Sequence, residues 1–337
     1  GQIGVGIITG IEIISEVAQG YEGNEKLAEL LALGSITAGA NAVKFQLVYA
    51  DELATPDYMY YDLFKSLEMQ LSEWSKICSM IRENDKLVYF DVFGKKSLDV
   101  ALELGADGVK LSTTEFYNTS LFSDALSSFD RVFLSVGGIP VDDIDSKLAD
   151  LSVKEKQKVL LMYGFQSEPT PLDQNNLNKI RLLRKRYPDF RIGFMDHSDG
   201  GSKDSIYLPL VALGVGLDAI EKHITLDHNL EIEDYVSGLT PTMFSNFTST
   251  VRRFEKVFGP NSLDLSQLEE EYRKKATKSV VALRDIGKGE TLTEESVSLK
   301  RSSIGIVDGS VLDIDYVLGK TLNQDILENH QIMEDMV

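Results

Sequence analysis

Cysteine is almost absent from the 337-residue sequence, in which Cys78 is the single one. One thiol cannot form an intramolecular disulfide, so a hydrophobic core must stabilise the fold, and a cytoplasmic location is expected. No window reaches the ~18 uncharged apolar residues that a membrane helix needs. The opening residues 1–20 are apolar, but they lack a basic segment and include Glu12 and Glu16. We therefore expect no signal peptide.

Positive charge is also scarce, because 34 basic side chains face 53 acidic ones and leave a net charge of −19. Such a surface repels nucleic acids and anionic membranes, which we exclude as partners. The hydrophobic content of 43% and charged content of 26% are those of an ordinary soluble globular protein. An anionic substrate would therefore need a site that gathers positive charge locally.

Short apolar runs recur along the first 260 residues, and we read eight of them as buried parallel strands. They are residues 11–18, 41–47, 87–93, 108–112, 131–137, 158–164, 191–197 and 219–225. Amphipathic segments such as 24–39 and 241–259 separate them with helical spacing. An open doubly wound sheet is the competing architecture, but eight units without a dinucleotide fingerprint favour a closed (β/α)₈ TIM barrel.

The composition of the sequence changes after Gly259, where it becomes polar and highly charged. We expect a barrel domain over residues 1–260 and a polar linker with a short helix over 261–278. Short strand and turn patterns over 279–337 predict a second, small, β-rich domain.

In a barrel of this kind, chemistry is found at the C-terminal ends of the strands. Polar and charged residues do collect at the ends of the predicted strands. They are Glu16, Lys44, Gln46, Asp91, Lys110, Thr113, Glu115, Ser135, Gln166, Ser167, Glu168, Asp196, His197, Glu221, Lys222 and His223.

Two of the four histidines, His197 and His223, end neighbouring strands. Two imidazoles at that spacing predict a divalent-metal pair, while the alternative is two hydrogen-bonded structural histidines. Lys44 and Lys110 could bind a phosphate or carboxylate, form a Schiff base, or pair structurally with an acid. Glu16 could bind substrate hydroxyls or move protons, or it could form a salt bridge across the barrel mouth.

Several segments, in order, carry a family resemblance. They are "SEVAQGYEG", "AVKFQ", "GVKLSTTE", "FLSVGG", "GFMDHS" and "AIEKHITLD", followed by the tail "ALRDIGKGETLTEESVSLKR". Together they resemble the sialic acid synthase family, also called the N-acetylneuraminate synthase family. The tail looks like that family's C-terminal SAF, or antifreeze-like, domain.

The resemblance implies a condensation. Phosphoenolpyruvate (PEP) would add through C3 to the aldehyde of an open-chain hexosamine of the N-acetylmannosamine type. The product would be a nine-carbon 2-keto-3-deoxy acid of the sialic, legionaminic or pseudaminic type, with phosphate released. The resemblance also implies a Mn²⁺ or Mg²⁺ ion and a homodimer in which the SAF domain contributes to the partner's site.

By the same resemblance, each site residue has an expected role. The metal ligands are His197 and His223; the catalytic residues are Glu16, Lys44, Lys110 and Glu115; the substrate-binding residues are Gln46, Thr113, Ser135, Gln166, Glu168, Asp234 and Arg301. Glu221 and Lys222 are expected to support the metal site and its charge balance.

The sequence departs from the family at several strand ends. The third strand ends Phe90-Asp91-Val92-Phe93 where the family has Ser-Thr-Pro-Phe, and Met195 replaces the serine before Asp-His. Gln166 and Glu168 stand where the family has Asn and Tyr. Two alternatives therefore stay open: a metal-dependent or Schiff-base aldolase or lyase using a pyruvate-like enolate, and a non-catalytic sugar-binding relative.

Overall fold

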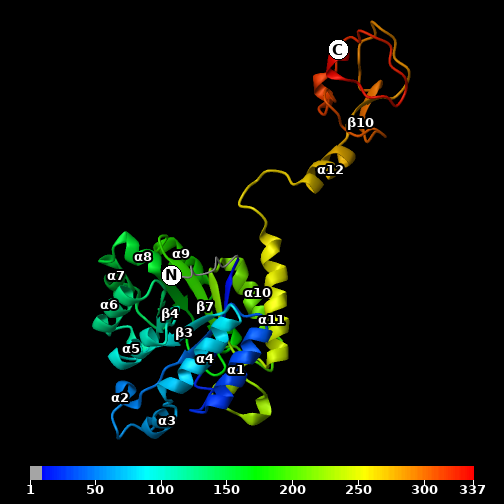
Figure 1. The fold of residues 1–337 in the computed structure, drawn as a ribbon. Helices are drawn as coiled ribbons and strands as arrows, with labels where there is room; N and C mark the ends of the chain where they lie inside the picture. Colours follow the sequence, from blue (N-terminus) through cyan, green and yellow to red (C-terminus); the bar gives the residue numbers. More distant parts are fainter. Residues whose placement is uncertain (1–9) are drawn as a thin grey trace. The chain divides into compact units, whose positions relative to one another are not determined.

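The computed structural model describes residues 10–337, so the first nine residues of the apolar opening lie outside the description. Figure 1 shows strands surrounded by helices in the N-terminal unit. The strands are β1 Glu12–Ala18, β2 Ala42–Gln46, β3 Leu87–Asp91, β4 Gly108–Leu111, β5 Val132–Ser135, β6 Val159–Tyr163, β7 Arg191–Asp196 and β8 Ala219–His223. Each pairs in parallel with the next, and β1 pairs with β8 to close the barrel. The predicted (β/α)₈ barrel is confirmed.

The helices lie on the outside of this barrel (Figure 1). They are α1 Glu25–Thr37, α4 Leu71–Glu83, α5 Lys95–Glu103, α6 Thr119–Ser128, α7 Val141–Ala149, α8 Val153–Lys158, α9 Asn178–Arg186, α10 Asp204–Val215 and α11 Pro241–Phe254, with the short α2 Ala50–Leu53 and α3 Tyr61–Ser66 after β2. Local capping sets where several begin: Asn24 accepts a hydrogen bond from the Leu27 amide at α1, and Thr240 caps α11 ahead of Pro241. The largest hydrophobic core lies between strands and helices.

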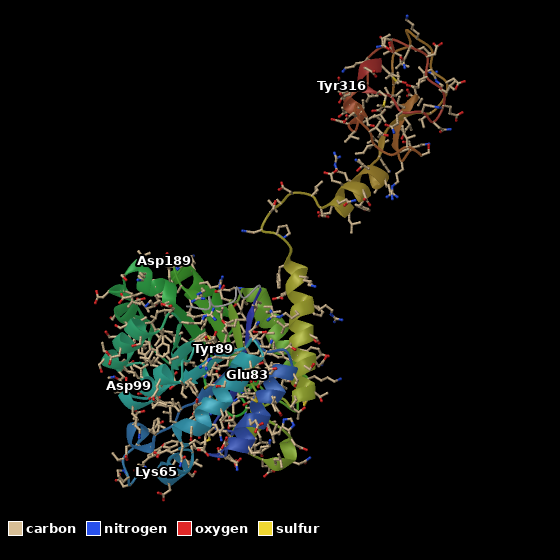
Figure 2. The ribbon with its side chains drawn as sticks, viewed as in Figure 1. Lys65, Glu83, Tyr89, Asp99, Asp189 and Tyr316 are labelled. Atoms are coloured by element: carbon tan, nitrogen blue, oxygen red, sulfur yellow. The ribbon has the colours of Figure 1, made fainter. Side chains whose placement is uncertain are left out.

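Side chains that point into the barrel form a separate apolar layer. This layer consists of Ile14, Ala42, Tyr89, Phe133, Leu160, Met162, Met195 and Ala219. Tyr89, labelled in Figure 2, also donates its hydroxyl to Glu12 at the start of β1, and Arg131 contacts Glu12 at 3.1 Å. The N-terminal end of the barrel is therefore filled, and polar chemistry has room only at the C-terminal end.

The chain divides into two compact units at Gly259 and Pro260. The second unit begins with α12 Gln267–Ala276 and contains an antiparallel pair, β9 Ser279–Ala282 and β10 Val297–Lys300. Its small core includes Val280, Leu292, Val317 and Ile332. Over residues 10–337, no helix is long and apolar enough to cross a membrane.

Candidate active site

Alternation along β8 decides which of its terminal residues face the barrel interior. Side chains of successive strand residues point to opposite faces. Because Ala219 belongs to the interior layer, Glu221 and His223 also point inward. Lys222 points outward, where its Nζ lies 2.8 Å from Asp196 Oδ2 and 3.1 Å from Ser198 Oγ. Lys222 thus pairs on the opposite face of the sheet from His223, and its expected support of the metal site stays a prediction.

Five buried charged residues form an ion cluster above the apolar layer: Glu16, Lys44, Asp91, Lys110 and Glu221. Lys44 Nζ pairs with Glu16, lies 2.6 Å from Asp91 Oδ1 and lies 3.6 Å from Glu221 Oε2. Lys110 Nζ lies 3.0 Å from Glu221 Oε1. The two lysines thus share Glu221, and strands β1, β2, β3, β4 and β8 meet at one point.

The charges of this ion cluster nearly cancel. Three carboxylates and two ammonium groups sum to −1 when all are ionised. Burial raises the pKa of Glu16 well above its usual value; Lys44 opposes this effect, and the negative charges of Asp91 and Glu221 add to it. Burial alone would also raise the pKa of Glu221, but Lys110 and Lys44 lower it to about 2. A proton entering the cluster therefore goes to Glu16, which leaves the cluster neutral.

His197 and His223 lie side by side at the same end of the barrel, with ring centroids 5.1 Å apart. Burial lowers the pKa of His197 to about 4, and burial also holds the pKa of His223 well below its usual value. Both rings are therefore neutral near pH 7, which is the form that binds metals. The Nδ1 atoms of both rings are buried without a hydrogen-bond partner. The alternative of hydrogen-bonded structural histidines leaves these two atoms unexplained.

The histidine pair fits a divalent cation as two of its ligands. No group of three or more His, Cys, Asp or Glu side chains within residues 10–337 is arranged to hold a metal ion. The remaining ligands would have to be water or substrate oxygen atoms, which leaves open positions as in catalytic sites.

One side of the mouth presents hydroxyl groups. Thr113 Oγ1 lies 3.0 Å from Ser135 Oγ and donates to the Gly137 carbonyl at 2.9 Å. Gly137 is required here, because a Cβ at this position would lie 1.8 Å from the Gly164 carbonyl oxygen. The loops after β5 and β6 thus approach closely and fix the position of Thr113.

The other side of the mouth is lined by amides and acids. Gln19 Nε2 donates to Gln46 Oε1 at 2.8 Å, and the Gln19 amide donates to Asp234 Oδ2 at 3.2 Å. Burial raises the pKa of Asp234 to about 7, with Glu168 adding a nearby negative charge. Three predicted substrate-binding residues, Gln46, Glu168 and Asp234, are therefore brought together.

Residues 33–262, more than half of the chain, match the NeuB family, and residues 277–337 match the SAF domain. The chain belongs to the NeuB family. The resemblance noted from the sequence is thereby confirmed.

Relatives in the NeuB family include named acid synthases. The N,N'-diacetyllegionaminic acid synthase of Campylobacter jejuni is 25% identical, over 96% of this chain and 98% of that protein. An uncharacterized protein of Methanocaldococcus jannaschii is 28% identical, over 87% of this chain and 86% of its own. The crystal structure of the N-acetylneuraminic acid synthetase of Leptospira borgpetersenii is 26% identical, with a TM-score of 0.73 over 80% of this chain and 93% of that one.

Three predicted site residues form no hydrogen bond or ion pair with the ion cluster, the histidine pair or the groups on the two sides of the mouth within residues 10–337. Within the described residues, Glu115 forms no ion pair, and its carboxylate accepts a hydrogen bond from Thr114 at 2.9 Å. Gln166 is exposed on the loop after β6. Arg301 lies in the second unit, where its Nε donates to the Ala276 carbonyl at 3.0 Å.

Three contacts were missed by sequence reasoning. Asp91 was noted as a strand-end residue and as a departure from the family, but it was not assigned as the partner of Lys44; their strands β2 and β3 are neighbours, which was the available signal. Met195 Sδ accepts a hydrogen bond from Lys110 at 2.9 Å. Gln19 links Gln46 to Asp234 on one side of the mouth, and nothing in its sequence context indicates that role.

Proposed function

We propose that this chain is a PEP-dependent sugar-acid synthase acting on an open-chain amino sugar of the N-acetylmannosamine type. C3 of PEP forms a bond to the aldehyde carbon, and the aldehyde oxygen takes a proton and becomes a hydroxyl. Water adds to C2 and inorganic phosphate leaves, giving a nine-carbon 2-keto-3-deoxy acid. The relatives named as legionaminic and sialic acid synthases support this reaction class.

The observation that carries the proposal is the convergence of Lys44, Lys110 and Glu16 with His197 and His223 at the open end of the barrel. Lys110 and Lys44 would bind the carboxylate and phosphate of the donor as point charges. The hydroxyls of Thr113 and Ser135 would turn from their present partners to donate to the same anion. Holding two reactants in one orientation supplies a large part of the rate in such a condensation.

Charge balance supports a bound divalent cation. A donor with a phosphate and a carboxylate brings at least two negative charges to an ion cluster that has no surplus positive charge, because the cluster is neutral with Glu16 protonated and sums to −1 with Glu16 ionised. We propose that His197 and His223 hold Mn²⁺ or Mg²⁺, which when bound would polarise the sugar aldehyde as a Lewis acid and offset the charge of the donor.

Glu16 is the proton carrier in this scheme. Its raised pKa keeps the carboxyl protonated at higher pH than an ordinary glutamate. Its Oε1 is held at 2.6 Å by the backbone amide of Ala18, so the carboxyl has a fixed orientation. A protonated Glu16 can deliver its proton to the aldehyde oxygen as the new carbon–carbon bond forms.

Gln46, Glu168 and Asp234 would bind hydroxyl groups of the sugar on the opposite side of the mouth. We also propose that Glu115 and Gln166 contact the sugar, and that in a homodimer Arg301 completes the partner's site.

The test combines the purified chain, MnCl₂, PEP and a panel of hexosamines, with inorganic phosphate as the readout. We expect phosphate release only when a sugar is present, and loss of at least a hundredfold in Lys110→Met. Lys95→Met, at an exposed ion pair on α5, is the matched control and keeps full activity. Absence of sugar-dependent release across the panel would refute the synthase assignment.

A second candidate, an aldolase using a pyruvate-like enolate, is favoured by one observation. Lys44 donates to Asp91 and Lys110 donates to Met195, two positions at which the sequence departs from the family. If Lys110 forms a Schiff base, borohydride treatment with pyruvate adds a stable mass to the wild-type chain and none to Lys110→Met. A metal-dependent version predicts loss of activity with a chelator and no trapped adduct.

A further inference from the structure

A buried ion pair joins the two strands that carry the histidine pair. Asp196 and Lys222 each stand directly before a histidine, His197 and His223, and they are partners in the register of β7 and β8. Both side chains are fully buried, and Lys222 Nζ lies 2.8 Å from Asp196 Oδ2. The pairing of β7 with β8 ends at this position. The ion pair therefore fixes how far apart the two strands lie where the histidines begin.

Asp196 also shapes the turn that carries His197. Its other carboxylate oxygen, Oδ1, accepts a hydrogen bond from the Ser198 amide at 2.8 Å, which closes a turn around His197. The hydroxyl oxygen of Ser198 accepts a further hydrogen bond from Lys222 Nζ at 3.1 Å. One buried carboxylate thus holds the backbone on both sides of His197 and ties it to β8.

The histidine rings themselves lack a usual form of support. Metal-binding histidines commonly donate their second ring nitrogen to a carboxylate or carbonyl oxygen, which fixes the orientation of the ring. Here both Nδ1 atoms are buried without a partner within the part of the chain that the structure describes. No contact through Nδ1 therefore orients either ring, and the backbone that carries His197 and His223 has to set their positions.

The ion pair suits a geometric role better than an electrostatic one. Asp196 and Lys222 carry opposite charges, so together they add no net charge behind the histidine pair. A buried ion pair is also weak evidence for stability alone, because apolar residues of similar volume often stabilise a core equally well. Metal ligands, in contrast, have to lie within about 0.2 Å of their proper distances. Small shifts between β7 and β8 would therefore reduce metal affinity.

We propose that Asp196 and Lys222 are positioning residues for the metal site. Together with Ser198, they set the separation and orientation of His197 and His223 from the opposite face of the sheet. Neither residue would touch the cation, yet both would contribute to its affinity. This role rests on the proposed metal site, but its test needs neither PEP nor a sugar.

Titration of the purified chain with MnCl₂, with free Mn²⁺ followed by EPR, measures the effect. Asp196→Leu/Lys222→Met removes both charges and the acceptor of the turn, whereas Asp196→Asn/Lys222→Met keeps an oxygen for the Ser198 amide. We expect the Kd for Mn²⁺ to rise about 10–100-fold in the first variant, the range typical when groups that orient metal ligands are removed. It should rise less in the second, because the turn around His197 is retained.

The matched control removes a buried ion pair at the other end of the barrel. Glu12→Leu/Arg131→Met also deletes two opposite charges, which lie 3.1 Å apart far from the histidines along their strands. Its Kd for Mn²⁺ should equal that of the wild type. His197→Ala defines the loss of the site, and urea unfolding establishes that each variant is folded.

A folded Asp196→Leu/Lys222→Met chain that binds Mn²⁺ as tightly as the wild type would overturn the positioning role, as would an equal loss in the control. Should that variant fail to fold, an unchanged Kd in Asp196→Asn/Lys222→Met would overturn it instead. Wild-type binding that His197→Ala does not weaken, or no binding at all, would refute the metal site and this role with it. Sugar-dependent phosphate release is measured separately, so the reaction can stand when the positioning role fails.

Discussion

The affinity of the barrel mouth for an anion depends on how Lys44 is neutralised. Glu16, Asp91 and Glu221 all lie around its ammonium group. Burial alone would lower the pKa of Lys44, but Asp91 and the other two acids raise it, so the ammonium stays charged. Asp91 is the one of these three acids that departs from the family pattern, and its carboxylate lies 2.6 Å from Lys44 Nζ, where a donor anion would bind.

Replacing Asp91 should therefore improve donor binding. Asp91→Asn keeps the side-chain shape and removes one negative charge. Two unit charges about 5 Å apart at an effective dielectric of 20 interact by about 3 kcal/mol, so we expect the KM for PEP to fall at least tenfold in steady-state kinetics. Asp99→Asn, on the exposed face of α5, is the control and should leave KM unchanged. A KM that stays the same or rises in Asp91→Asn would show that this carboxylate does not oppose the donor.

Asp234 should make stability depend on pH. Its pKa is raised from 3.8 to about 7 by burial and by Glu168, so the folded state holds a proton that the unfolded chain releases. That contribution is complete below pH 3.8 and is lost as pH rises through 7. Asp234→Asn should thus raise the free energy of unfolding by about 1–2 kcal/mol at pH 8 and by less at pH 5, after allowance for partial solvent exposure.

Urea unfolding at the two pH values measures this difference, with the exposed Asp150→Asn as control. An equal change at both pH values would mean that Asp234 is not protonated in the folded protein near neutrality.

Individual site residues differ in how far the sequence predicts them. Lys44, Lys110, His197 and His223 stand at the ends of apolar runs, and barrel geometry alone brings such positions together. Glu115 and Gln166 also follow strands, but they lie on loops whose path is set by local hydrogen bonds rather than by the barrel. The Gln19–Asp234 contact joins residues more than 200 positions apart, and no local pattern encodes it.

Successive residues of one strand contribute to two different environments, because their side chains point to opposite faces of the sheet. In β8, Glu221 enters the ion cluster while Lys222 is fully buried against Asp196 beneath the outer helices. Strict alternation would have placed Lys222 outside from the sequence alone. The close approach of Gly137 to Gly164, in contrast, involves two loops and required coordinates.

Breaking the outward ion pair should destabilise the barrel. Lys222→Met leaves the Asp196 carboxylate buried without its partner, and we expect a loss of about 3–5 kcal/mol in the free energy of unfolding. The double variant Lys222→Met/Asp196→Leu should recover most of this loss, since neither charge remains. Lys95→Met, which breaks an exposed pair, should cost less than about 1 kcal/mol. Chemical denaturation measures all three, and a small effect of Lys222→Met would show that the pair contributes little.

Taken over its full length, the chain combines an acidic surface with a locally balanced site. The net charge of −19 disfavours an anionic donor, and the ion cluster offers no surplus of positive charge. A neutral His197–His223 pair is the place where a cation could restore the balance. The barrel could be predicted from periodicity alone, whereas this balance could not, because it depends on which acids face inward.

The central claim is that the chain cleaves the C–O bond of PEP only when a sugar is joined to its C3. The most direct test follows phosphate by ³¹P NMR during turnover of PEP and a hexosamine in ¹⁸O-labelled water. Because water attacks C2, the account predicts unlabelled inorganic phosphate, formed only in the presence of sugar. Labelled phosphate, or release without sugar, would contradict it.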